Sequence, residues 1–136
     1  LCLAEMDDES TRLATLRNRL FSGLSTGIDD VVLNGPVLDD PSLRLPGNLN
    51  CSFSFVDGEA LMMSMRDLAV SSGSACTSAN PEPSHVLRAL GLNDDQTRAS
   101  LRFGLGRFTT SDEVDFAVET VAEAVRRLRR MSSLAR

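Results

Sequence analysis

Residues 49–55, Leu-Asn-Cys-Ser-Phe-Ser-Phe, alternate strictly between apolar and polar side chains. Successive side chains of a β-strand point to opposite faces of the sheet, so this pattern predicts a strand with one apolar and one polar face. Cys51 falls on the apolar face, where a free cysteine behaves as a small buried hydrophobe. A sheet built from such strands must be covered on that face by other elements.

Helical periodicity supplies the covering elements. Leu13, Leu16, Leu20 and Leu24 recur at helical spacing and predict an amphipathic helix over residues 5–22 that stops at Gly23. The other expected elements are strands at 31–33, 69–72 and 100–108 and helices at 58–68, 83–91 and 110–131. Together they predict an α+β fold, in which a short mixed or antiparallel sheet of three or four strands is covered by helices.

Composition narrows the functional classes. A length of 136 residues suits one domain, and a net charge of −5 argues against a nucleic-acid partner. No apolar run approaches the roughly 20 residues that a membrane span requires. Three cysteines without metal-like spacing suit a reducing compartment, so we expect the cytoplasm or an organelle matrix such as that of mitochondria. All fourteen basic residues are arginine, so no amine for a Schiff base lies in this segment.

Cys76 is the main candidate for chemistry. It lies in the run Ser-Ser-Gly-Ser-Ala-Cys-Thr-Ser, residues 71–78, where no large side chain is present to bury it. One interpretation is a surface thiol without a role. The other is a reactive thiol on a loop of small residues, since exposed thiols are the ones that react. Cys2 shows no pattern that suggests a role.

Two further residues, His85 and Arg102, each allow a structural as well as a functional interpretation. His85 is the only histidine, and it follows Cys76 by nine residues on a predicted helix with no orienting partner, so neither a Cys–His pair nor a metal site is favoured. Arg102 lies on the polar face of the predicted strand at 100–108. It is either a solvated or ion-paired arginine, or a guanidinium that binds a carboxylate through two hydrogen bonds.

Several motifs resemble one known family. The stretches SSGSACTS, EPSHVLRALG and LRFGLGRFTT, together with LRNRL, LNCSFSFVDGEALM and RDLAVSSGSAC, follow one another in an order that covers nearly the whole chain. They resemble the C-terminal small domain of the cysteine desulfurases that supply sulfur for iron–sulfur cluster assembly. The resemblance implies a homodimeric fold-type I enzyme that uses pyridoxal phosphate to convert L-cysteine to L-alanine.

The resemblance also implies roles for two residues. Cys76 would be the nucleophile that takes the substrate sulfur as a persulfide, and it could briefly ligate an iron–sulfur cluster shared with a scaffold protein. Arg102 would bind the substrate carboxylate. The expected partners are L-cysteine, iron–sulfur scaffolds and other sulfur acceptors. Pro81 and His85 depart from the pattern of the family without touching the cysteine motif.

The expected domain organisation follows from the same resemblance. Residues 1–136 would form a single small domain, with a connecting helix over 1–23 and a mobile cysteine loop over 71–83. The lysine and the other residues that hold the cofactor would belong to a large domain upstream of Leu1, so this segment alone would be inactive. A stand-alone sulfur carrier and a purely structural interaction domain are the alternatives.

Overall fold

The structure, a computed structural model, describes residues 4–72 and 83–132. In these ranges the helices are α1 (Met6–Gly27), α2 (Gly58–Met63), α3 (His85–Ala89), α4 (Asp94–Arg98) and α5 (Ser111–Met131). The strands are β1 (Val31–Leu33), β2 (Asn48–Phe53), β3 (Ser71–Ser72) and β4 (Ser100–Gly104). Strands and helices thus follow the α+β pattern that the sequence predicts.

The four strands form one sheet in the order β1-β2-β4-β3. All three neighbouring pairs are antiparallel, so the antiparallel form of the predicted sheet is the one that occurs in the described ranges. Leu49 of β2 pairs with Phe103 of β4, and Cys51 pairs with Leu101. The strand that lies earliest in the sequence is therefore at one edge, and the strand that leads to Cys76 is at the other.

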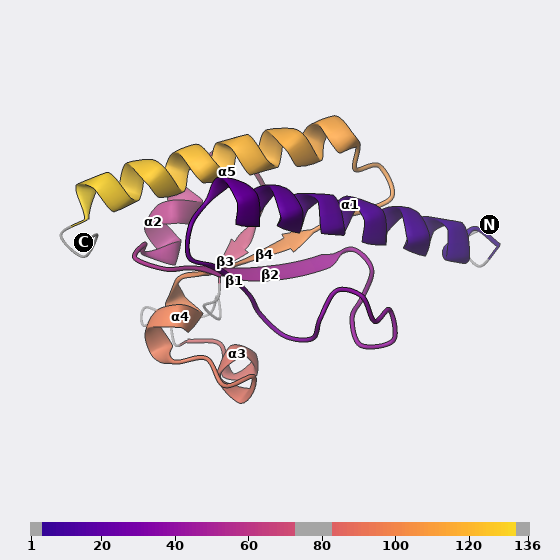
Figure 1. Cartoon of the computed structure of the whole chain (residues 1–136), viewed down its shortest axis with the longest axis horizontal. Helices are drawn as coiled ribbons and strands as arrows, with labels where there is room; N and C mark the ends of the chain where they lie inside the picture. Colours follow the sequence, from indigo (N-terminus) through magenta and orange to yellow (C-terminus); the bar gives the residue numbers. More distant parts are fainter. Residues whose placement is uncertain (1–3, 73–82, 133–136) are drawn as a thin grey trace.

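The two long helices lie side by side along one face of the sheet (Figure 1). They run in the same direction, because Arg19 pairs with Asp115 near the start of α5, and Arg126 near its end donates to the carbonyl of Gly27. The predicted stop of α1 at Gly23 is wrong. A Cβ atom at this position would lie 2.7 Å from Cγ2 of Val118, so the glycine permits close contact with α5 and the helix continues.

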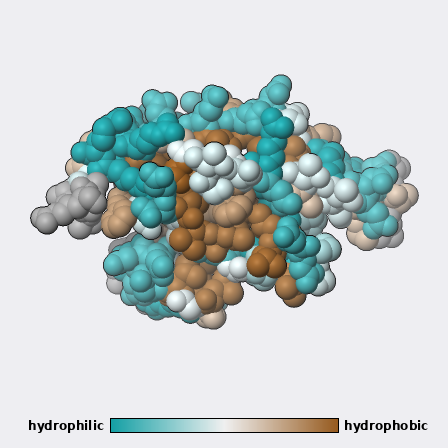
Figure 2. Space-filling model, in the orientation of Figure 1, coloured by the Kyte–Doolittle hydropathy of each residue, from teal (hydrophilic) through white to brown (hydrophobic). Residues whose placement is uncertain are grey.

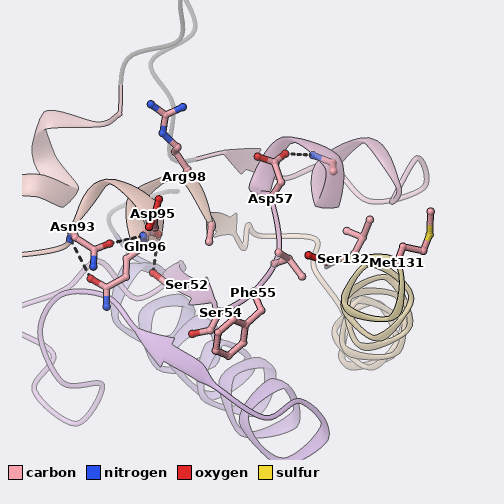
Figure 3. A pocket seen from close by; sticks show the side chains of 14 residues that line it. Ser52, Ser54, Phe55, Asp57, Asn93, Asp95, Gln96, Arg98, Met131 and Ser132 are labelled. Carbon is pink, nitrogen blue, oxygen red and sulfur yellow. Dashed lines mark hydrogen bonds between the residues drawn. The ribbon is translucent and has the colours of Figure 1, made fainter. Parts of the chain in front are cut away.

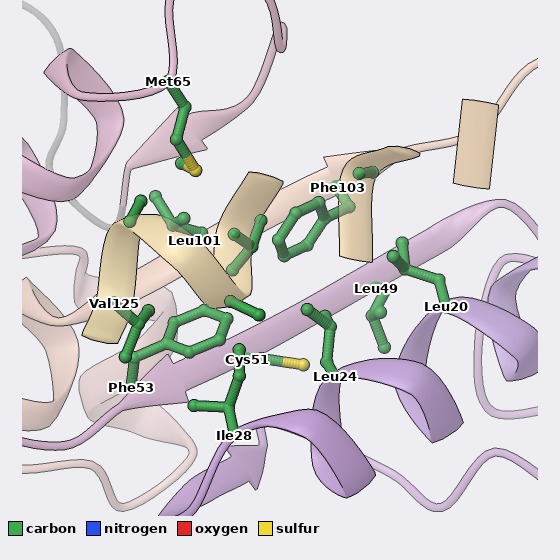
Figure 4. Close-up of a cluster of buried hydrophobic side chains, with 14 of the residues drawn as sticks. Leu20, Leu24, Ile28, Leu49, Cys51, Phe53, Met65, Leu101, Phe103 and Val125 are labelled. Carbon is green, nitrogen blue, oxygen red and sulfur yellow. The ribbon is translucent and has the colours of Figure 1, made fainter. Parts of the chain in front are cut away.

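The core lies between these helices and the sheet, as Figure 4 shows. Leu49, Cys51 and Phe53 of β2 are completely buried there, which confirms the apolar face predicted from the alternation. The cluster also contains residues from α1, α2, β4 and α5: Leu16, Leu20, Leu24, Leu61, Leu101, Phe103, Val114, Val121 and Val125. Burial of this set is the main source of stability for the fold.

Several further expectations differ from the structure. The strand expected over residues 100–108 is β4, which ends at Gly104. Strand β2 ends at Phe53, and Phe55, expected on the apolar face, has a φ of +64° and is half-exposed. Helix α2 ends at Met63 instead of continuing to residue 68. Helix α4 was not expected, because five residues are too few to show a helical period. Its signal is a capping box, in which Asn93 and Gln96 each accept a hydrogen bond from the other's backbone.

Helices α3 and α4 lie on the other side of the sheet from α1 and α5 (Figure 1). In the view of Figure 2, apolar surface gathers across the middle of the molecule, whereas the outer surface of the long helices is hydrophilic. No helix in residues 4–72 and 83–132 is long and apolar enough to cross a membrane.

Candidate functional site

The second face of the sheet carries a row of polar residues that crosses all four strands. Alternation directs Leu101 and Phe103 into the core, so Arg102 between them points to the opposite face. Arg102 is paired with Asn50 of β2 on one side and with Ser71 of β3 on the other. Asn34, directly after β1, donates its backbone N–H to the carbonyl of Asn50 and completes the row.

The side chain of Arg102 is exposed and makes one hydrogen bond to the described residues. Its Nη2 atom donates one long hydrogen bond of 3.4 Å to Oγ of Ser71, and no carboxylate of the described residues lies within ion-pair distance. Arg102 therefore forms no surface ion pair with the described residues. A guanidinium that is held on a strand and makes only one long hydrogen bond to the described residues is suited to bind a carboxylate from outside the domain.

Beside Arg102 lies a buried polar cluster, defined here as Asn34, Ser52, Ser100 and the side chain of Asn50. The Nδ2 atom of Asn34 lies 2.7 Å from Oδ1 of Asn50 and 2.9 Å from Oγ of Ser52. The hydroxyl of Ser52 reaches Oδ1 of Asn34 at 3.0 Å, and that of Ser100 donates to the carbonyl of Gln96 at 2.7 Å. Such a network is stable in a buried place because its polar groups have partners.

Two buried arginines hold the irregular segment 34–47 beside this cluster. Arg44 donates to the backbone carbonyl of Asn34 at 2.8 Å, and Arg17 of α1 donates to that of Leu38 at 2.8 Å. Burial lowers the pKa of both guanidinium groups below the ordinary value, and the charge of Arg17 lowers that of Arg44 further. Sequence reasoning missed both residues, because nothing in the pattern separates them from exposed arginines.

The three cysteines fall into different categories. Cys76 and Cys2 lie outside the described residues, so the structure does not test their predicted roles. Cys51 is confirmed as a core thiol, and burial raises its pKa to about 12. A thiol with this pKa is not ionised at neutral pH and does not act as a nucleophile.

His85 is exposed at the start of α3, after the N-cap Ser84. In the described residues, no group of three or more His, Cys, Asp or Glu side chains is arranged to hold a metal ion. The prediction that Cys76 ligates an iron–sulfur cluster falls on a residue that the structure does not describe.

A cavity of about 700 Å³ adjoins the polar cluster at Ser52, but Asn34, Asn50, Ser71 and Arg102 are not among the residues that line it (Figure 3). It is formed at the end of β2 by α4, the start of α2 and the end of α5, and its lining includes Phe55, Asp57, Arg98 and Met131. Asp57 is engaged as the N-cap of α2, where it accepts a hydrogen bond from the N–H of Ala60. None of the residues predicted to do chemistry lines it, so we place the candidate site at Arg102 instead.

Comparison with known proteins gives first the class of fold. A solved structure titled NifS-like protein superimposes with a TM-score of 0.73 at 23% identity, and it covers 93% of this chain and 30% of its own. The NifS-like protein from Rickettsia africae gives a TM-score of 0.72 at 19% identity over 90% of this chain and 31% of its own. The fold is thus that of a segment of NifS-like proteins. No protein-family model matches the chain.

Sequence comparison then gives the family. Cysteine desulfurase IscS from Anaeromyxobacter sp. Fw109-5 is 56% identical over 126 residues, which are 93% of this chain and 30% of that protein. Cysteine desulfurase IscS from Shewanella woodyi is 53% identical over 131 residues, or 96% of this chain and 31% of that protein. The chain thus matches a segment of this cysteine desulfurase family, and it spans about 30% of the length of these relatives.

Proposed function

We propose that this chain is the small domain of a pyridoxal-phosphate-dependent cysteine desulfurase, in which Arg102 binds the carboxylate of L-cysteine and Cys76 receives its sulfur. The enzyme would work as a homodimer in the cytoplasm or the mitochondrial matrix. The persulfide would pass to iron–sulfur scaffolds and other acceptors. Brief ligation of a cluster by Cys76 belongs to the same proposal.

The position of β3 carries this proposal. Ser71 contacts Arg102, and Ser72 is the last residue described before the segment that contains Cys76. Four residue steps separate Ser72 from Cys76, and a chain spans at most about 3.6 Å per residue, so their Cα atoms lie within about 14 Å. This short connection supports a proposal in which the thiol of Cys76 acts on a substrate that Arg102 holds.

The chain offers no lysine to which the cofactor could be attached. None of its residues could therefore bind pyridoxal phosphate as a Schiff base. The residues present fit the carboxylate and the sulfur of the substrate instead. We therefore place the cofactor and its lysine in the remainder of the enzyme, beyond the 30% of the relatives that this chain spans.

The proposed sulfur transfer needs no external oxidant or reductant. The thiolate of Cys76 attacks the sulfur of L-cysteine, an S–S bond forms, and the Cβ–S bond of the substrate breaks. The electron pair of the broken bond stays on Cβ, which takes a proton and becomes the methyl group of alanine. The product on the protein is a persulfide of Cys76.

Mass spectrometry of the full-length enzyme after one turnover with L-cysteine tests the nucleophile. We expect an added sulfur on the peptide that contains Cys76 and none on that peptide in Cys76→Ser. Cys51→Ser is the matched control and keeps persulfide formation, because Cys51 is buried and not ionised. Added sulfur on Cys51 or Cys2 in the Cys76→Ser enzyme would overturn the assignment.

Binding of the substrate tests Arg102. Loss of a charge-assisted hydrogen bond costs about 1.5–3 kcal/mol, so Arg102→Ala should weaken the affinity for L-cysteine roughly ten- to a hundred-fold. Arg98→Ala is the control, because Arg98 is also exposed but lines the cavity and is not part of the row that contains Arg102. Unchanged affinity in Arg102→Ala would show that Arg102 is only a surface residue.

A further inference from the structure

Asn50 is the residue directly opposite Arg102 in the β2–β4 pairing. Its side chain is half-buried, and its Oδ1 atom accepts a hydrogen bond of 2.7 Å from Nδ2 of Asn34. Among the described residues, the Nδ2 atom of Asn50 has no acceptor. The amide is thus held at its oxygen, and its two N–H donors are left available.

The neighbouring side chains determine which way this amide faces. In the structure, Asn34 directs its Nδ2 atom at Oδ1 of Asn50, at 2.7 Å, and accepts from the hydroxyl of Ser52 through its own Oδ1, at 3.0 Å. Asn50 can accept only through its oxygen. The oxygen and nitrogen of an amide lie on opposite sides of the Cβ–Cγ bond. An oxygen directed at Asn34 beside β1 therefore leaves the nitrogen on the side of β4, where Arg102 lies.

Asn34 in turn is held rigidly. It is 3% exposed, its backbone N–H donates to the carbonyl of Asn50 at 2.9 Å, and its own carbonyl accepts from Nη2 of Arg44 at 2.8 Å. The whole residue is therefore fixed by the backbone pairing and by a buried arginine. The orientation of the Asn50 amide is set before any ligand arrives, which lowers the entropic cost of binding.

From this juxtaposition we infer that Asn50 donates a further hydrogen bond to the substrate carboxylate bound by Arg102. The inference rests on the proposed role of Arg102 and extends it. A carboxylate has about four acceptor positions, and a guanidinium fork occupies two of them. A neutral amide donor at the next strand fills a third without adding charge, and it selects substrates that carry an α-carboxylate.

Calorimetric titration of the full-length enzyme with L-alanine and with ethylamine tests the inference, because ethylamine is alanine without its carboxylate. Asn50→Ala should weaken alanine binding roughly tenfold and leave ethylamine binding unchanged. Asn50→Asp keeps an acceptor for Asn34 but places a negative charge beside the carboxylate, so it should weaken alanine binding further. A melting curve for each variant shows that the fold is intact.

Asn48→Ala is the matched control. Asn48 is the same residue type, on the same strand and face, but it is paired with Gly104 instead of Arg102. It should bind alanine as the unmodified enzyme does. If Asn50→Ala binds alanine normally while Arg102→Ala does not, the inference is wrong and the proposed function stands.

Two other outcomes are also decisive. If Arg102→Ala itself binds alanine normally, the carboxylate site at Arg102 is wrong, and the inference fails with it. If Asn50→Ala weakens ethylamine as much as alanine, Asn50 acts through the fold and not through the carboxylate. That result overturns the inference about Asn50 and leaves the proposed role of Arg102 standing.

Discussion

The two faces of the sheet differ in the kind of residue they carry and in what surrounds those residues. On the first face, β2 contributes Leu49, Cys51 and Phe53, all completely buried under the long helices. On the second face, the same strand contributes Asn50 and Ser52, which belong to a hydrogen-bonded network that ends beside the exposed Arg102. The strand thus stabilises the fold with one set of residues and presents polar groups with the other.

The difference separates stability from function. The apolar face gains free energy from area removed from water, and that gain does not depend on any ligand. The polar face gains little net energy from its hydrogen bonds but loses much if one partner is removed. Its residues are therefore held in defined orientations, which is what a binding site requires.

The largest effect is expected on the apolar face. Phe53→Ala removes a completely buried ring and leaves a cavity, which typically costs about 3–5 kcal/mol. Phe108→Ala is the control, because Phe108 is 87% exposed and should change stability by less than about 0.5 kcal/mol. Urea denaturation followed by circular dichroism measures both. Equal losses in the two variants would contradict the assignment of the core.

A second effect comes from pH. Burial raises the pKa of Cys51 to about 12, above its value in the unfolded chain, so folding favours the neutral thiol. This contribution is complete below pH 9 and is lost as the pH rises toward 12. At pH 11 the loss is about 2–3 kcal/mol. The measurement is the free energy of unfolding from pH 8 to 11, with Cys51→Ala as the control that lacks this dependence; parallel curves would refute the prediction.

An intermediate effect is expected in the polar cluster. Asn34→Ala removes the partner of Oδ1 of Asn50, whereas Ser52 keeps Ser100 and the carbonyl of Gln96, and an unsatisfied buried group costs about 1–3 kcal/mol. Asn48→Ala, on the same face, should cost less because no described residue makes a hydrogen bond to that side chain. Urea denaturation compares the two. If Asn34→Ala leaves the free energy of unfolding unchanged, the polar cluster does not contribute to the stability of the protein.

The smallest effect on stability is expected for Arg102. Its side chain is exposed and makes one long hydrogen bond, so Arg102→Ala should change the free energy of unfolding by less than about 0.5 kcal/mol. Arg44→Ala is the matched control, because this buried guanidinium holds the carbonyls of Asn34 and Pro36 and its loss should cost more. Thermal melts compare the two. A large loss in Arg102→Ala would argue that it serves the fold and not a ligand.

Local patterns were sufficient for most of the fold. The alternation around Cys51 located β2 and its buried face, and the capping box of Thr110 and Glu113 located the start of α5. Both signals are local, because they depend on side-chain period and on hydrogen bonds over three residues. The predicted Cys76 stays a prediction, since its segment lies outside the described residues.

The sequence by itself determined the period of the longer elements, the buried place of Cys51, the absence of a Schiff-base lysine and the family resemblance. Only the tertiary structure decided that Gly23 is a contact between α1 and α5 and not a helix stop, because that contact joins residues far apart in the chain. It also decided that Asn34, Asn50 and Arg102 form one row. Strand order and register bring them together, and these depend on how the sheet packs under its helices, which no local pattern encodes.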